Sequence, residues 1–166
     1  MQQSTPGGPA RPEWDAAVGR LLGAAAEAEA RLADLLRVLA GTEGSIAARL
    51  LPQEVPEMAG LVRDLLPVAV PERRLVEDFL RWVHAVARLC ALRATVVHSI
   101  WEVRHDGRRT HMHPSWSRTR EERHPMTAGE LTRTTAALSR FLGAPADELL
   151  LRLDKAAPEL SVFPWV

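Results

Sequence analysis

The chain has 166 residues, of which 46% are hydrophobic and 25% are charged, and its formal net charge is zero. This length suits one domain, and the composition is that of a globular protein and excludes a disordered or collagen-like chain. The single cysteine, Cys90, excludes a disulfide framework and a cysteine-rich zinc module.

The N-terminal segment, residues 1–12, predicts a disordered leader, because it is rich in Gln, Ser, Gly and Pro and has no apolar signal-peptide core. No apolar run is long enough to span a bilayer, so we expect a cytoplasmic protein with no membrane partner. A single helical domain is expected over residues 13–155, followed by a C-terminal tail over residues 156–166.

The apolar residues recur mostly at helical spacing, which predicts an all-α bundle of about five or six helices. The first helix is expected to begin near Pro12–Trp14 and to end near Ala40, before Gly41. Pro67 is expected to close one helix and Pro71 to open the next, while Thr127 and Glu130 form a capping box. The later helices are predicted over residues 45–51, 56–66, 71–101, 127–142 and 145–153.

One segment departs from helical spacing. Residues 101–113 predict a β-hairpin, because Asp106-Gly107 between two short flanks suits a type I′ turn. We expect no other β-structure. The surrounding region is cationic, since residues 88–124 contain eight arginines against four acids, and all six histidines lie between positions 84 and 124.

The helix predicted over residues 71–101 should be the longest or second-longest. Arg93 and His98 lie five residues apart on it and therefore point about 140° apart. Each flanks the predicted apolar stripe, so the arginine of one copy can meet the histidine of another across a two-fold axis. The stripe consists of Val76, Phe79, Val83, Val86, Ala87, Cys90, Ala94, Val97 and Trp101.

The segment Arg93-Ala94-Thr95-Val96-Val97-His98 has the R-x4-H spacing of HEPN domains, and the following Ser99-Ile100-Trp101 resembles one branch of that family. HEPN domains are all-helical modules of bacterial toxins and antiviral defence systems, many of which cleave RNA. The resemblance implies a metal-independent endoribonuclease without cofactor, or a weakened relative that still binds RNA. It also implies a homodimer and a cognate antitoxin or defence partner.

The resemblance assigns Arg93 to the phosphate and His98 to proton transfer, which suits a permanent cation and a group that titrates near neutrality. The family usually has a polar residue directly after the arginine, where this chain has Ala94. Thr95, Ser99 and Glu102 are candidate supporting residues. RNA phosphates are expected to contact the arginines of the hairpin region, which are Arg104, Arg108, Arg109, Arg118 and Arg120.

Other interpretations of these residues remain open. Arg93 can be an ordinary ion-paired surface residue, and His98 can be a histidine at the negative end of a helix dipole. His111 and His113, with His98 or His105, offer imidazoles to a zinc ion, although no spaced cysteine pair or H-E-x-x-H motif accompanies them. The alternative function is a non-enzymatic helical interaction module, the small partner in a bacterial conflict system.

Overall fold

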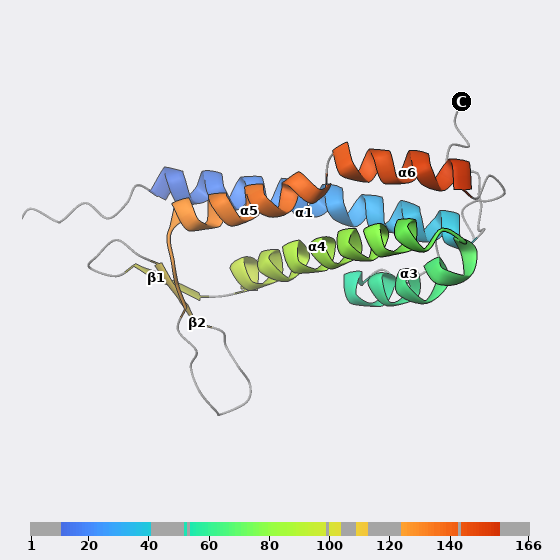
Figure 1. The fold of residues 1–166 in the computed structure, drawn as a ribbon. Coiled ribbons are helices and arrows are strands. Elements are labelled where there is room, and N and C mark those ends of the chain that lie inside the picture. Colours follow the sequence, from blue (N-terminus) through green and yellow to red (C-terminus); the bar gives the residue numbers. More distant parts are fainter. Residues whose placement is uncertain are drawn as a thin grey trace, which may run out of the picture.

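The computed structural model describes residues 11–40, 52, 54–98, 100–103, 109–112, 124–142 and 144–156. These residues are mostly helical, which confirms the all-α fold class (Figure 1). The helices are α1 (Arg11–Leu39), α3 (Val55–Ala69), α4 (Arg73–His98), α5 (Ala128–Leu142) and α6 (Ala144–Ala156). Within the described ranges, no helix is both long enough and apolar enough to cross a membrane.

Several predicted helix boundaries are confirmed within a few residues, and α4, with 26 residues, is second in length to α1, with 29, among the described helices. The predicted helix over residues 45–51 lies outside the described residues, as do the predicted leader up to residue 10 and the tail from residue 157.

The expected roles of Pro67 and Pro71 were wrong. Pro67 lies inside the last turn of α3, and the helix continues past it, since the Val70 N–H donates to the Leu66 carbonyl at 3.0 Å. Pro71 precedes α4 and does not begin it. The first turn of α4 is closed by the Val76 N–H, which donates to the Glu72 carbonyl at 3.1 Å.

The backbone after α4 forms short antiparallel strands in the order β1 (Ile100–Val103), β2 (Arg109–Met112) and β3 (His124–Met126). α4 therefore ends at His98, and Trp101 belongs to β1 and not to the helix. β3 pairs with β2, so the expectation of β-structure only within residues 101–113 was wrong. The Asp106-Gly107 turn lies outside the described residues, and the hairpin as a unit stays a prediction.

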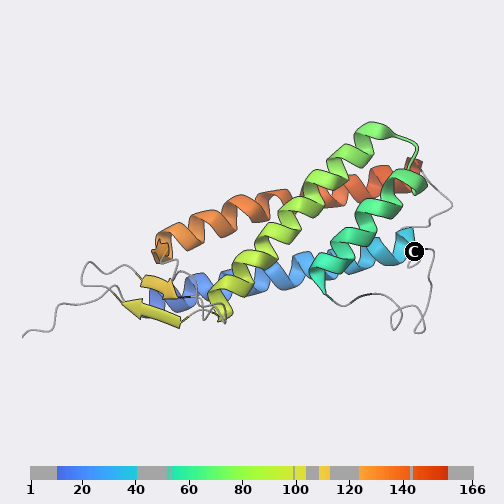
Figure 2. The same ribbon diagram turned by 90° about the horizontal axis from the view of Figure 1, so that it is seen from below.

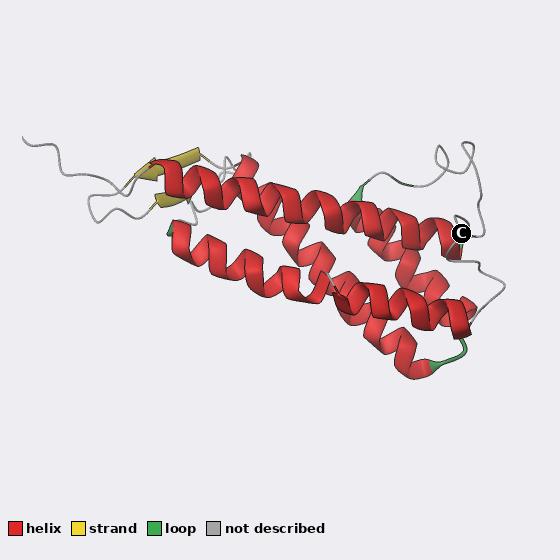
Figure 3. Ribbon diagram, turned by 90° about the horizontal axis from the view of Figure 1, so that it is seen from above, coloured by secondary structure: helices red, strands yellow, loops and turns green. Residues whose placement is uncertain are grey.

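The helices are arranged around α4, which packs against α1, α3, α5 and α6. α5 and α6 follow one another along the length of α1 (Figure 3). One face of α4 is buried as far as Leu89, and Val96 continues that face near the end of the helix. The largest fully buried side chains come from α1, α3, α4, α5 and α6 and include Leu21, Leu32, Leu66, Phe79, Leu89, Leu131 and Leu153.

The predicted apolar stripe of α4 is buried in its first half and becomes exposed in its second half. Val76, Val83 and Val97 are separated by seven and fourteen residues, which places them on one side of the helix, and their exposed fractions are 9%, 2% and 48%. Cys90, in the same row, is half-buried. The reason is that α3 has only 15 residues and runs beside the first part of α4, so the last turns of α4 extend beyond it (Figure 2).

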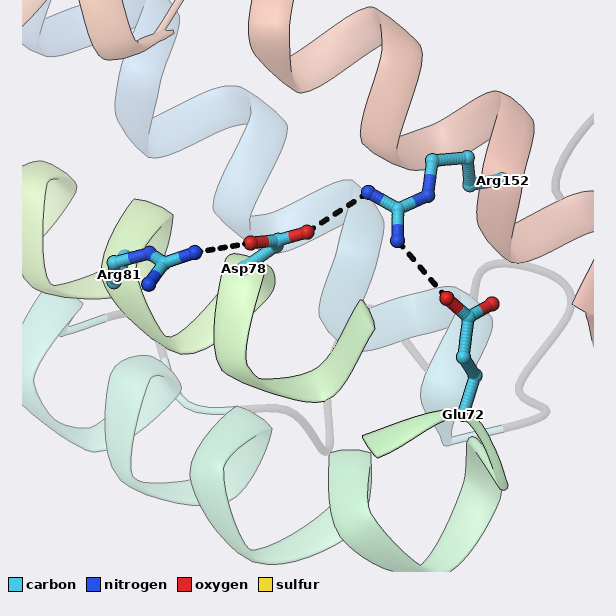
Figure 4. A network of polar contacts seen from close by, with 4 residues as sticks. All are labelled: Glu72, Asp78, Arg81 and Arg152. Carbon is cyan, nitrogen blue, oxygen red and sulfur yellow. Dashed lines mark hydrogen bonds and ion pairs between the residues drawn. The ribbon is translucent and has the colours of Figure 1, made fainter. Parts of the chain in front are cut away.

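The α6 helix is held to the rest of the bundle by charged side chains as well as by buried Leu149 and Leu153. Arg152 donates to Asp78 at 2.8 Å and to Glu72 at 3.1 Å, and Asp78 also pairs with Arg81 (Figure 4). At the other end of α6, Asp147 pairs with Arg31 of α1 at 2.6 Å.

Acid is expected to weaken the attachment of α6. The Arg152 guanidinium, with a smaller contribution from Arg81, holds the pKa of Asp78 below its usual value. A lowered folded-state pKa adds stability that is present above the unfolded pKa of about 3.9 and disappears as the pH falls through the folded value. Thermal melts of the wild-type chain and of Arg152→Gln should therefore differ at pH 6 and converge near pH 2. An equal difference at both pH values would contradict this account.

The capping box of α5 is confirmed. The Glu130 N–H donates to Thr127 Oγ1 at 3.1 Å, and the Thr127 N–H donates to Glu130 Oε2 at 2.7 Å. Together these bonds satisfy backbone donors that the first turn of a helix leaves without partners.

We expect Thr127→Ala to destabilise the chain by about 1 kcal/mol, the usual cost of losing an N-cap. Thr127→Ser keeps the hydroxyl and should lose much less stability. Urea unfolding of both variants measures the difference, and an alanine variant as stable as the serine variant would show that the cap contributes nothing.

Candidate functional site

The candidate site lies at the C-terminal end of α4, where the helix extends beyond α3. Arg93 and His98 are both exposed there. Among the described residues, neither side chain has a hydrogen-bond or ion-pair partner. The interpretation of Arg93 as an ion-paired surface residue therefore finds no support in the part of the chain that the structure describes.

Arg93 occupies an unusual position on the helix. Arg93 lies between Leu89 and Val96 in a row of residues, beginning at Val86, that are spaced three or four apart on one side of the helix. Because Val86, Leu89 and Val96 are buried, this position predicts burial for Arg93 as well. The side chain is nevertheless exposed, because an arginine carries its guanidinium to solvent on a long apolar stem. The predicted placement of Arg93 on a flank of the stripe was wrong, since the buried face of α4 is centred near Arg93 itself.

A single chain does not bring Arg93 and His98 together. Five residues of α-helix place them about 140° apart, so they leave the helix in different directions. Between them, Ala94 is half-buried and Val97 is 48% exposed. The end of α4 thus carries a cation, an imidazole and an incompletely covered apolar surface side by side.

The structure describes only some of the predicted supporting and RNA-binding residues. Thr95 is half-buried on α4 and makes an interaction of its own. Glu102 belongs to β1 and Arg109 to β2, each described by its backbone only. Ser99 and the remaining predicted RNA-binding residues, Arg104, Arg108, Arg118 and Arg120, lie outside the described residues.

Cys90 lies against the core one turn before Ala94. Its Sγ is 4.0 Å from the Ala25 carbonyl oxygen of α1. Burial, with the nearby negative charge of Glu29, raises the pKa of the Cys90 thiol. A raised pKa keeps the thiol protonated near neutral pH, which suits a packing role and not that of a nucleophile.

No cluster of three or more His, Cys, Asp or Glu side chains suited to a metal ion occurs within the described ranges. His105 and His113 lie outside these ranges, and His111 is described only by its backbone in β2. The zinc alternative built on these histidines therefore stays a prediction.

One exposed aromatic residue carries no motif in the sequence. Phe141, near the end of α5, is 62% exposed, although its neighbour Leu142 is buried. The only signal in the sequence is its position beside Arg140 and off the apolar row of Leu131, Leu138 and Leu142.

Comparison of the chain with protein-family models, curated proteins and solved structures gives no match.

Proposed function

We propose that this protein is a HEPN-like domain that acts on RNA, as a metal-independent endoribonuclease of a bacterial toxin or antiviral defence system. The proposal includes the finer architecture of five or six helices with one hairpin, a homodimer and a cytoplasmic location. The observation that carries it is the exposure of both Arg93 and His98 at the end of α4.

The chemistry requires only groups that this helix end supplies. A base removes the 2′-hydroxyl proton of the RNA, the 2′-oxygen bonds to phosphorus, and the bond from phosphorus to the 5′-oxygen breaks as that oxygen gains a proton. The products are a 2′,3′-cyclic phosphate and a 5′-hydroxyl. His98 moves the proton, and Arg93 stabilises the charge on the phosphoryl oxygens through its two-pronged guanidinium.

The site is composite, with Arg93 from one copy and His98 from the other. Arg93 and His98 of one helix point about 140° apart, and a two-fold axis can bring Arg93 of one copy to His98 of the other. Val97 and Ala94 lie between them and form the apolar part of the contact.

Mixing two inactive variants tests the composite site. Arg93→Ala and His98→Ala homodimers each lack one group in both sites. In a heterodimer one site lacks both groups and the other is complete, so an equal mixture should recover about a quarter of the wild-type rate after subunit exchange. Recovery should survive EDTA. No recovery despite verified heterodimers, or no cleavage by the wild-type chain, would contradict the proposal.

A second function, a non-enzymatic interaction module, is favoured by Ala94. The family's polar group at this position is absent, so nothing adjacent to Arg93 orients the phosphate or the imidazole. If the HEPN proposal holds, wild-type activity is low and Ala94→Asn raises it. A cleavage assay on both chains measures this difference. An inactive Ala94→Asn variant that still folds and dimerises would favour the interaction module.

A further inference from the structure

The outer surface of α5 and α4 combines an exposed aromatic ring with arginines that have no acidic partner among the described residues. Phe141 of α5 is 62% exposed. On the same helix, Arg133 and Arg140 are exposed and lie seven residues apart, so they share one side. Arg88 of α4 is exposed as well. We call these four residues the Phe141 surface.

The Phe141 surface carries three arginines whose charges are not neutralised by any side chain that the structure describes. Between Asp78 and His98 the α4 helix contains no acid, and the single acid of α5, Glu130, lies in the capping box. Among the residues that the structure describes, Arg88, Arg133 and Arg140 form no ion pair. Five arginines elsewhere in the bundle, Arg31, Arg37, Arg73, Arg81 and Arg152, each pair with a carboxylate.

Two flanks of α5 can be distinguished by their contacts. Arg20 of α1 donates to Thr132 at 3.0 Å, which fixes the α1 side of α5. Phe141 follows Thr132 by nine residues, or about 180° of helix, so it lies on the opposite flank. Because α5 packs between α1 and α4, this flank borders α4.

The level of Phe141 along the bundle follows from contacts of α1. Ala25 lies beside Cys90 of α4, and Arg31 pairs with Asp147, shortly after the end of α5. α1 and α4 run in opposite directions (Figure 1). The end of α5 therefore lies beside the turn of α4 that precedes Cys90 and carries Arg88.

We propose that the Phe141 surface binds single-stranded RNA, with the Phe141 ring stacked on a base and the arginines contacting phosphates. An exposed ring offers a face for any unpaired base, and unpaired arginines supply the cationic track for the backbone. The choice of RNA rests on the proposed function. Arg88 precedes His98 by ten residues, or about 15 Å along the helix, so a strand of a few nucleotides connects the two.

The test measures binding separately from cleavage. A fluorescein-labelled 12-nucleotide oligouridylate with 2′-O-methyl ribose lacks the attacking hydroxyl, so it reports affinity by anisotropy without turnover. Phe141→Ala should weaken its binding by about 5- to 100-fold, the loss expected for one stacked base, and Phe141→Trp should retain it. Leu151→Ala is the matched control, because Leu151 is a 52% exposed apolar residue of α6.

The salt dependence of probe binding tests the phosphate contacts of the arginines. Arg140→Gln should reduce the slope of log affinity against log salt by about 0.7, the value for one phosphate contact on a single strand. Arg37→Gln, which removes an exposed but ion-paired arginine far from this surface, should leave the slope unchanged. Wild-type protein that does not bind the probe at low salt, or Phe141→Ala binding as tightly as wild type, would overturn the inference.

Failure of this inference and failure of the proposed function give different results. If Phe141→Ala binds normally while His98→Ala abolishes cleavage, the function stands and the binding surface lies elsewhere. If the wild-type chain cleaves no RNA but loses probe binding in Phe141→Ala, the surface stands and the catalytic proposal fails. Preferential binding of an acidic peptide over the probe would assign the surface to a protein partner and overturn the RNA proposal.

Discussion

His98→Ala is expected to lower any RNA-cleaving activity of this protein by about 10²–10⁴-fold, the usual contribution of a general acid or base. His98 is exposed at the last residue of α4, so its removal leaves no cavity and should leave the helix content unchanged. Initial rates of cleavage of a labelled single-stranded RNA, with circular dichroism of both proteins, measure the two effects independently.

His84→Ala is the matched control for this variant. His84 is also an exposed histidine of α4 and lies fourteen residues earlier, away from the proposed site. Its removal should leave the rate of RNA cleavage unchanged.

Arg93→Lys, like His98→Ala, should impair cleavage, because an ammonium cannot reproduce the bidentate geometry of the guanidinium. Full activity of His98→Ala, or activity that EDTA removes, would instead favour a metal held by the histidines of residues 105–113.

Phe79→Ala is expected to cost about 3–5 kcal/mol of unfolding free energy, because it removes a large side chain from a close-packed core. Phe79 is 1% exposed on α4, which contacts four other helices. A domain of this size has roughly 5–15 kcal/mol of stability in total, so this one substitution should remove a large fraction of it. Urea titration followed by far-ultraviolet circular dichroism gives the change in midpoint.

Val68→Ala provides the comparison for the core variant. Val68 is 86% exposed on α3, and its truncation should change stability by no more than about 0.5 kcal/mol. A Phe79→Ala chain that unfolds at the same urea concentration as Val68→Ala would show that Phe79 is not part of the cooperative core.

The sequence determined those features that depend on neighbours along the chain. The leucine spacing of α1 predicted its extent, because a helix in contact with a core must repeat its apolar residues with the period of the helix. Thr127 and Glu130 predicted the start of α5, because a capping box forms between residues three positions apart. The R-x4-H spacing predicted Arg93 and His98 as candidate site residues, and helix geometry alone separates them by about 140°.

The tertiary structure decided which residues are covered. Val76 and Val97 have the same place in the heptad, yet one is buried and the other exposed, because α3 is shorter than α4 and covers only its first part. The sequence could not supply this difference, since burial depends on where a neighbouring helix ends and not on local spacing. The same holds for Arg152, whose partners Glu72 and Asp78 lie more than seventy residues away and meet it only when α6 packs on α4.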